Sequence, residues 1–483
     1  MTTLLGIILY SMGIWILLLM LWQGLNGSVD FLSMRNFALL GFVVFQLISG
    51  GVATFQTHPR DFVLVNQPTT AMIYLVMVTL FLGLFFLSYN RGWVVNWLAW
   101  RVPVGSAVPK ATSMLTLAFV FLGVGLMFRV VFIHIPVAAS AFFIMGSSML
   151  AVAAGMAAWV WGGRMFNPVI ATATAIITLL ALAGVLHTDF GRRAILGVVG
   201  CFGWGAYHGH WKHLGPKAVL IRLGGVGLAA LIFLAAFTAT RSGAERSISL
   251  KQKVSMLKGA NVKEGVSLLL SGQDAGRNSM WFIENYPSRY PYRTLHTARY
   301  FLSQPIPRII FPNKPDALGR LSVPQANADK HRASNYSVGP GIIGHISVDN
   351  PFIALPLYAV FGGLFIGFLD RLIRIHPDNP FVILPLGTTL GQIVGLARGE
   401  TGLFLFQATL GIAAAWIGMY LSAKGMSLLG WRIETVEDDE YDQYGDGEDQ
   451  DDDWRPDDGP EGWTSSWQDN LATLQHNRLS RHS

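Results

Sequence analysis

The sequence predicts an all-α, polytopic integral membrane protein. Apolar residues make up 52% of its 483 residues and charged residues only 13%, whereas soluble domains carry about 25% charged residues. Apolar runs long enough to cross about 30 Å of hydrocarbon recur along the chain. They do not show the alternating segments of about ten residues that a membrane β-barrel requires. The composition therefore excludes a soluble domain, a barrel and a chain that is disordered throughout.

We expect about eleven membrane-spanning helices. The seventh is short and rich in glycine, which is typical of a broken or tilted span. The predicted spans are residues 4–25, 36–55, 69–88, 111–133, 136–161, 167–187, 193–207, 217–239, 352–370, 380–397 and 401–423.

The orientation follows from the basic residues in the short loops, because such residues concentrate on the cytoplasmic side. With the N-terminus outside, the inner loops hold ten Lys and Arg residues and the outer loops five. This count favours a cytoplasmic C-terminus and places the long loop, residues 240–350, on the extracytoplasmic side.

Hydropathy and charge together divide the chain into four predicted regions. They are eight N-terminal membrane helices (1–239), the long loop (240–350), three C-terminal membrane helices (351–430) and a tail (431–483). The formal net charge is +6, yet residues 434–461 hold 15 acidic residues and one basic residue. Such a tail buries too little apolar surface to fold alone, and it either stays solvated in the cytoplasm or docks on a basic partner.

The long loop is basic, with 15 Lys and Arg residues against 7 Asp and Glu residues in 241–350. Guanidinium groups alternate with aromatic rings through Arg289-Tyr290-Pro291-Tyr292-Arg293 and again at Arg299-Tyr300. Arginine binds phosphate in a planar fork, and aromatic faces stack on sugar rings. This pattern suits an anionic, sugar-bearing ligand or acidic lipid headgroups, and nucleic acid is not expected on this face.

Four segments of the loop have distinct patterns. Residues 246–272 predict one or two amphipathic helices, and residues 276–284 predict a helix with Arg277 and Glu284 on one face. Four prolines within 304–315 exclude a regular helix and predict an extended strap. Glycines in 335–345 permit tight turns close to a ligand.

The order of three motifs resembles the oligosaccharide repeat-unit polymerases, the Wzy-type O-antigen polymerase family of bacterial inner membranes. The motifs are PRIIFPNKP (307–315), YSVGPGIIG (336–344) and FGGLFIGFLDR (361–371), and the resemblance covers residues 275–398. Members often have an acidic residue after the glycine-rich turn, where this chain has His345.

The resemblance implies a GT-C-like glycosyltransferase that polymerises lipid-linked repeat units into a surface polysaccharide such as O-antigen, capsule or exopolysaccharide. A growing glycan would leave its polyprenyl diphosphate and join a fresh lipid-linked unit. Lipid-linked oligosaccharide, membrane lipids and a chain-length regulator or export protein are the expected partners, and no cofactor or metal is expected.

Candidate site residues come from the loop and its flanks. Cations that neutralise a diphosphate leaving group are needed, together with a base for the acceptor hydroxyl. We expect His345 to be the base, with Glu284 or Asp349 as alternatives. The predicted catalytic residues are His345, Arg308, Arg277 and Glu284, and the predicted substrate-binding residues are Arg293, Arg299, Lys314, Tyr336 and Arg398.

Each residue also has a purely structural interpretation. Arg277 and Glu284 can pair with each other, Arg398 can reach the headgroups or pair with Glu400, and His345 can be a satisfied polar residue in a tight loop. At the level of function, a glycan ligase would use the same arginines. A transporter or a non-catalytic component of polysaccharide export is the alternative of another class, although transport predicts more charges within the spans.

Overall fold

The computed structural model describes residues 1–428 except 56–61, 103–108, 136–137, 189–191, 242–249, 272–273 and 327–336. Contacts divide the chain into Met1–Val436 and Glu437–Ser483. Every described residue lies in the first unit. The predicted tail, residues 431–483, begins after the last described residue and so falls outside the described residues.

The described residues form an all-helical membrane protein, which confirms the predicted class. Nine helical segments in them are long and apolar enough to span a membrane, namely Thr2–Leu25, Met34–Phe55, Gln67–Tyr89, Ala111–His134, Ala139–Gly163, Pro168–His187, Pro216–Thr240, Pro351–Ile375 and Thr401–Met426.

Helices α1 to α10 make up the N-terminal part. Their bounds are α1 Thr2–Leu25, α2 Met34–Phe42, η1 Val43–Ile48, α3 Ser49–Phe55, α4 Gln67–Tyr89, α5 Gly92–Ala99, α6 Ala111–Val130, η2 Phe132–His134, α7 Ala139–Gly163, α8 Pro168–Thr188, α9 Arg192–Gly209, η3 Trp211–His213 and α10 Pro216–Arg241.

Helices α11 to α20 make up the long loop and the C-terminal part. Their bounds are α11 Leu250–Lys258, α12 Val262–Ser271, α13 Ala275–Asn285, α14 His296–Ser303, α15 Leu318–Gln325, α16 Gly341–Val348, α17 Pro351–Ile375, α18 Pro380–Gly387, α19 Leu390–Gly395 and α20 Thr401–Leu428.

Two of the eleven predicted spans differ from the other nine. The glycine-rich seventh span is α9, a continuous helix that is not among the segments apolar enough to span. The predicted span 380–397 is the one that breaks, into α18 and α19 at Thr388–Thr389. At the break the amides of Thr388 and Thr389 donate to the carbonyls three residues back, those of Pro385 and Leu386, in place of α-helical bonds to the fourth residue back.

The long loop contains the expected short helices, but its proline-rich strap is not extended. Residues 304–313 form successive turns, with the amides of Ile310 and Phe311 both donating to the carbonyl of Pro307. The prolines do exclude a regular helix, as predicted. They are compatible with turns because proline fixes φ near the value that turns require.

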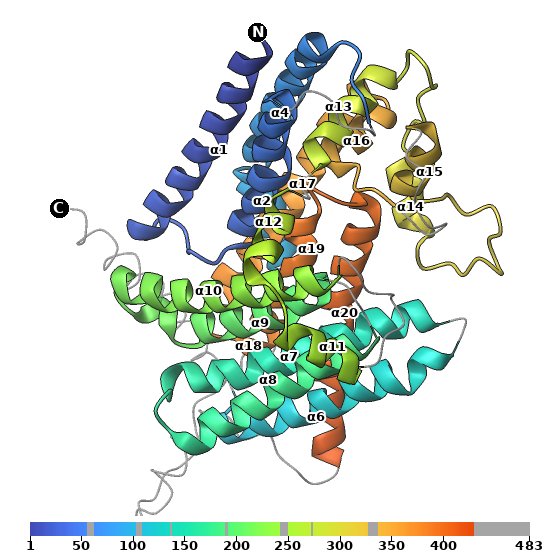
Figure 1. Ribbon diagram of the computed structural model, residues 1–483. Helices are drawn as coiled ribbons and strands as arrows, with labels where there is room; N and C mark the ends of the chain where they lie inside the picture. Colours follow the sequence, from blue (N-terminus) through green and yellow to red (C-terminus); the bar gives the residue numbers. More distant parts are fainter. Residues whose placement is uncertain are drawn as a thin grey trace, which may run out of the picture. The chain divides into compact units, whose positions relative to one another are not determined.

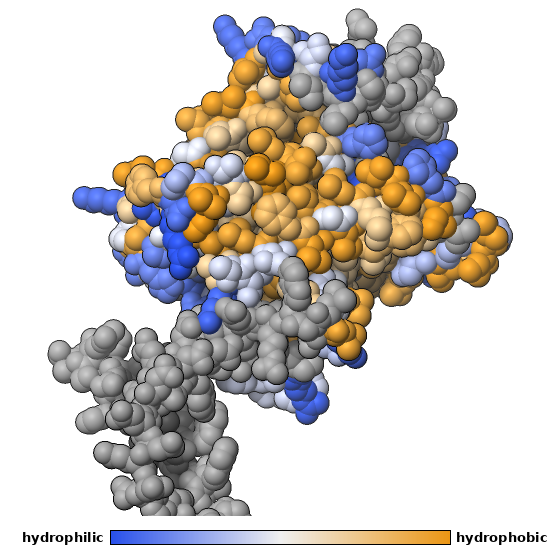
Figure 2. Space-filling view, turned by 90° about the horizontal axis from the view of Figure 1, so that it is seen from below, coloured by the Kyte–Doolittle hydropathy of each residue, from blue (hydrophilic) through white to orange (hydrophobic). Residues whose placement is uncertain are grey.

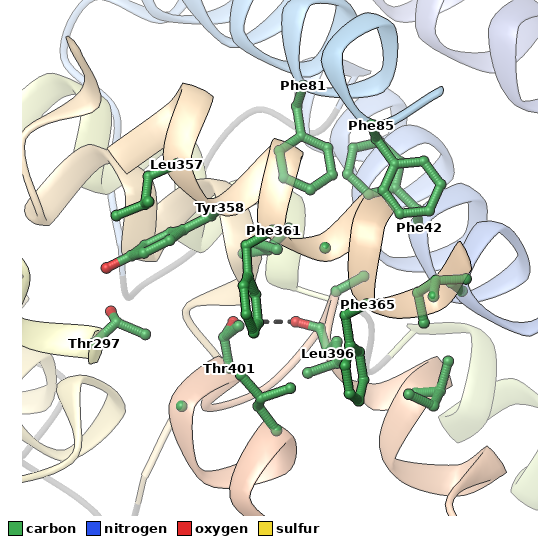
Figure 3. A pocket seen from close by; sticks show the side chains of 18 of the residues that line it. Phe42, Phe81, Phe85, Thr297, Leu357, Tyr358, Phe361, Phe365, Leu396 and Thr401 are labelled. Atoms are coloured by element: carbon green, nitrogen blue, oxygen red, sulfur yellow. Dashed lines mark hydrogen bonds between the residues drawn. The ribbon is translucent and has the colours of Figure 1, made fainter. Parts of the chain in front are cut away.

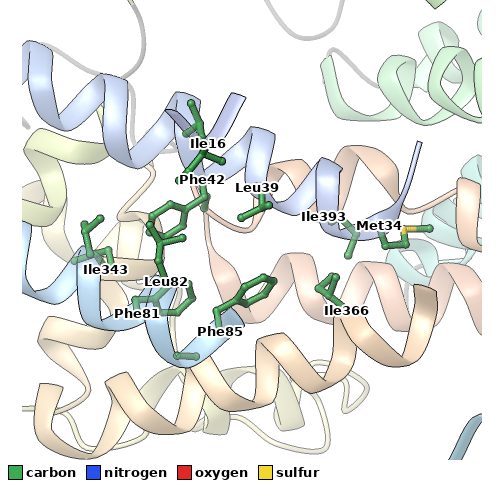
Figure 4. Close-up of a cluster of buried hydrophobic side chains, with 14 of the residues drawn as sticks. Ile16, Met34, Leu39, Phe42, Phe81, Leu82, Phe85, Ile343, Ile366 and Ile393 are labelled. Atoms are coloured by element: carbon green, nitrogen blue, oxygen red, sulfur yellow. The ribbon is translucent and has the colours of Figure 1, made fainter. Parts of the chain in front are cut away.

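One hydrophobic core joins the N-terminal helices to α17 and α19 (Figure 4). Ile16 of α1, Leu39 of α2, Phe85 of α4 and Ile366 of α17 are among its buried side chains. Helices α4 and α17 pack closely because Gly363 of α17 lies against the backbone of α4. Small residues at such a contact let two helix backbones approach in a membrane.

Helices α6 to α9 lie side by side and cross the direction of α1 and α4 (Figure 1). They enclose a second core. Apolar side chains cover most of the centre of the face that is lowest in Figure 1, and hydrophilic ones gather near its edges (Figure 2). Such a surface fits contact with lipid.

The π-helical segment η1, whose Val43 and Leu47 belong to the first hydrophobic core, links that core to the long loop. The side chain of its Gln46 accepts a hydrogen bond from the Tyr74 hydroxyl at 2.8 Å and donates to the carbonyl of Ala397. Gly341, with φ of +72°, passes so close that a Cβ there would overlap the Gln46 amide. The contact fixes the start of α16, and π-helical turns occur frequently at functional sites.

Candidate functional site

An apolar groove of about 310 Å³ lies between α2, α4, α14, α17, α19 and α20 (Figure 3). Aromatic and aliphatic side chains form most of its wall, including Phe42, Phe81, Phe85, Leu357, Phe361, Phe365 and Leu396. Its polar lining residues are Thr297, Tyr358 and Thr401. These three residues connect the groove to a buried cluster of ionisable groups.

Asp349 is at the centre of this cluster and is fully buried. Its Oδ2 accepts the backbone N–H of Thr297 at 2.9 Å and the hydroxyl of Tyr358. Its Oδ1 is buried and accepts no hydrogen bond from a described residue. Burial raises the pKa of Asp349, and the hydrogen bonds from Tyr358 and Thr297 oppose that rise.

His345 lies one turn before Asp349 on α16 and is fully buried. Its Nδ1 is 2.8 Å from the Thr297 hydroxyl, and its Nε2 accepts the backbone N–H of Thr401 at 3.3 Å. This arrangement puts the ring proton on Nδ1, directed at Thr297. Burial lowers the pKa of His345 to about 3, so its ring is neutral near pH 7.

Glu400 completes the cluster from the start of α20. Its two carboxylate oxygens accept the amides of Leu318 at 2.7 Å and Gly319 at 2.9 Å, at the N-terminus of α15. One of these oxygens is 3.6 Å from Nε2 of His345. Burial raises the pKa of Glu400 to about 7, although the two amides act against this.

These two shifts predict opposite pH dependences of stability. The raised pKa of Glu400 gives stability below pH 4.5 that is lost as the pH rises towards 7. The lowered pKa of His345 gives stability above pH 6.5 that is lost as the pH falls. Between pH 4.5 and 6.5 the free energy of unfolding of the native protein therefore changes little with pH, because the two slopes are opposite in sign.

Glu400→Gln is therefore expected to lose thermal stability on acidification relative to the native protein, and His345→Gln to gain it. Tryptophan fluorescence during thermal unfolding in detergent, from pH 4.5 to 6.5, measures both slopes. Parallel slopes in the two variants would show instead that the pair titrates as one charged unit.

Left-handed backbone conformations flank the cluster. Leu295, with φ of +57°, directly precedes α14, whose second residue is Thr297. Asn350, with φ of +72°, directly follows Asp349 and caps α17 through its side chain. Residues other than glycine adopt this conformation only where the surroundings impose it, and they cluster at functional sites.

The two cations of the strap contact the strap itself. Arg308 pairs with Asp316 at 2.7 Å, and both side chains are about half exposed. The ammonium group of Lys314 donates to the carbonyls of Gln304 at 3.1 Å and Ile306 at 3.3 Å. Both residues thus stabilise the turns between α14 and α15.

Arg293 and Arg299 lie at the surface beside the buried cluster. Burial is the main cause of the lowered pKa of His296, and the positive charges of Arg293 and Arg299 lower it further. The charge of Asp349 also acts on His296 and raises its pKa. Both exposed arginines lie on the segment that carries Thr297, and the backbone N–H of Arg293 donates to the carbonyl of Val348, the residue before Asp349.

Two other predicted cations are on the side of α13 and η1. Arg277 is half-buried on α13, where burial lowers its pKa and nearby Asp274 raises it. The guanidinium carbon of Arg398 lies 5.5 Å from the centre of the Phe45 ring, a cation–π contact. Tyr336 lies outside the described residues.

Glu284 has a structural contact at the start of α4. Its carboxylate accepts the amides of Val65 at 2.9 Å and of Asn66, the residue that caps α4. Glu284→Ala is expected to lower the free energy of unfolding by about 1 kcal/mol, as loss of a helix cap does. Glu284→Gln keeps an acceptor oxygen and should cost less. Chemical denaturation measures both, and loss of activity in both variants with unchanged stability would favour a catalytic role instead.

Thr297, Tyr358, Thr401 and Glu400 were not among the predicted site residues. Thr297 follows His296 inside the arginine-rich segment, and Glu400 is two residues from Arg398. Proximity in sequence to predicted arginines was thus the only signal for Thr297 and Glu400. It does not reveal the contacts with His345, which is 48 residues from Thr297 and 56 from Thr401.

Comparison of the chain with models of protein families, with curated proteins and with solved structures finds no match in any of the three.

Proposed function

We propose that this chain is a GT-C-like glycosyltransferase that polymerises lipid-linked oligosaccharide repeat units on the extracytoplasmic face of the bacterial inner membrane. The proposal rests on one observation above all. An apolar groove adjoins a buried carboxylate, Asp349, through its lining residues Thr297 and Tyr358, and the segment that carries Thr297 also carries the exposed Arg293 and Arg299.

The groove fits the polyprenyl chain of such a substrate. Its wall is nearly all apolar and includes α2, α4, α17 and α20 of the membrane-spanning segments, so an isoprenoid enters it without losing an apolar environment. Its volume is at the lower end of the usual range for ligand pockets, about 300–1,000 Å³. Part of the lipid chain would then remain in the bilayer.

The reaction is a displacement at the anomeric carbon of the donor glycan. The acceptor hydroxyl forms the new C–O bond, and the bond between that carbon and the diphosphate oxygen breaks. Polyprenyl diphosphate leaves with the electron pair. The acceptor proton passes to a base, and Arg293 and Arg299 supply positive charge for the leaving group.

Asp349 is the base that the geometry favours, with His345 as a positioning residue. The neutral His345 ring directs its Nδ1 proton at the hydroxyl of Thr297, whose backbone N–H donates to Asp349. Tyr358, which lines the groove, donates to the same carboxylate. These contacts hold Asp349 in one orientation, as a general base requires.

Purified protein in lipid nanodiscs, incubated with lipid diphosphate-linked repeat units, tests the proposal. A ladder of glycan lengths is expected on a gel. A single added block would favour a ligase, and no product with a substrate that a related polymerase extends would reject the glycosyltransferase assignment.

A further inference from the structure

The last turn of α14 and the turns that follow it expose an unusual run of apolar side chains. Leu302 is 69% exposed, Ile309 80% and Ile310 73%. Ile306 and Phe311 are exposed to a lesser degree. Residues 302–311, named here the apolar loop, project outward from the helices (Figure 1).

Polar contacts hold the apolar loop in this form. Lys314 donates to two carbonyls within it, those of Gln304 and Ile306, and the ion pair of Arg308 with Asp316 joins it to the segment that follows. The prolines restrict its backbone further. The exposed isoleucines are therefore carried on a constrained segment.

The base of the apolar loop borders the same groove as the membrane-spanning helix α17. Leu302 lines the groove together with Leu357 and Phe361 of that helix. At 1.5 Å per residue, these positions lie about 9 Å and 15 Å along α17 from its start at Pro351. Leu357 and Phe361 are themselves half exposed, as side chains that contact lipid would be.

We propose that the apolar loop inserts Ile309 and Ile310 into the adjacent leaflet of the bilayer, beside the groove. Acyl chains of lipids are the partner, because the exposed apolar surface continues onto a spanning helix. Arg308 and Lys314 then lie at the level of the lipid phosphates. On the proposed function, the loop also joins the leaflet to the groove, so that a polyprenyl lipid enters without crossing water.

Site-directed fluorescence tests the insertion without any assay of activity. Ile309→Cys, Ile310→Cys and the control Asn313→Cys are each made with Cys201→Ala, because Cys201 is the single native cysteine. Each is labelled with an environment-sensitive dye and placed in nanodiscs that contain lipids with a nitroxide near the top of the acyl chain.

Nitroxide lipids are expected to quench the labels at positions 309 and 310 at least twofold more than the label at 313. Aqueous iodide is expected to quench the labels at 309 and 310 less than the label at 313. Iodide quenching equal to that at 313, without quenching by nitroxide lipids, would overturn the proposal. Both quenchers report on the loop alone, so failure of polymerisation leaves this result interpretable.

A double variant tests the consequence for substrate entry. Ile309→Ser with Ile310→Ser is expected to raise KM for the lipid-linked donor several-fold with kcat unchanged, since the buried cluster is not altered. Unchanged KM would overturn the entry role. A dye on Leu302→Cys reports on the base of the loop, with positions 309 and 310 either native or both serine. Equal quenching of that dye by nitroxide lipids in the two loops would overturn anchoring by the two isoleucines.

Discussion

Replacement of Asp349 with asparagine is expected to slow glycan polymerisation by about 10² to 10⁴-fold, the usual contribution of a general base. Asparagine matches the shape of aspartate and keeps an oxygen that accepts from Tyr358 and the Thr297 amide. It lacks the basic oxygen that takes up the acceptor proton. The initial rate of ladder formation in nanodiscs measures the effect.

Two further variants separate catalysis from a general loss of charge or packing. Asp378 follows the end of α17 that is opposite Asp349, and its exposed carboxylate pairs with Lys212. Asp378→Asn removes this carboxylate and should leave the rate unchanged. Tyr358→Phe removes one hydrogen bond to Asp349 and should reduce the rate less than Asp349→Asn does. An Asp349→Asn protein with native stability and native rate would assign the base elsewhere.

His345 shows why the site was only partly predictable. Its place after the glycine-rich turn singled it out in the sequence, and the structure does place it in the buried cluster. Its surroundings come from α14 and α20, 48 and 56 residues away. Burial keeps the ring neutral, and the contacts from these helices occupy both nitrogens, which local sequence patterns do not encode.

The strap shows the reverse case, in which the residue types were informative and their contacts were not. Its prolines excluded a helix, as predicted, and Lys314 and Arg308 were chosen because they are cations on a rigid segment. Their side chains bind the carbonyls and the carboxylate of that segment. Sequence alone does not distinguish a cation that awaits a ligand from one that stabilises a turn.

The spans were the most predictable part because hydrophobicity and length determine them directly. The break between α18 and α19 was not predicted, since 380–397 is apolar throughout most of its length. Pro385 and the adjacent threonines, Thr388 and Thr389, were the signals present. Buried hydroxyls that bond to carbonyls of their own turn satisfy the backbone at this break.

Two neighbouring glycines on α17 are expected to give opposite results when they are enlarged. A Cβ on Gly363 would lie 2.1 Å from the Ser88 hydroxyl oxygen and 2.4 Å from the Phe85 carbonyl oxygen of α4. A Cβ on Gly362 would meet only the Phe85 ring, at 3.8 Å, and it faces the groove. The first glycine therefore serves packing and the second leaves space for a ligand.

Gly363→Ala is expected to lower the free energy of unfolding by about 1–3 kcal/mol, because the backbone of α4 must move. Gly362→Phe should leave thermal unfolding nearly unchanged and fill the groove, with at least a tenfold loss of affinity for a polyprenyl diphosphate. Gly83→Phe is the matched control, since a Cβ on that exposed glycine of α4 meets nothing within 4 Å. Lipid affinity in nanodiscs and thermal unfolding distinguish the three variants. If Gly362→Phe binds polyprenyl diphosphate as tightly as Gly83→Phe does, the isoprenoid lies outside this groove and the observation that carries the proposed function is lost.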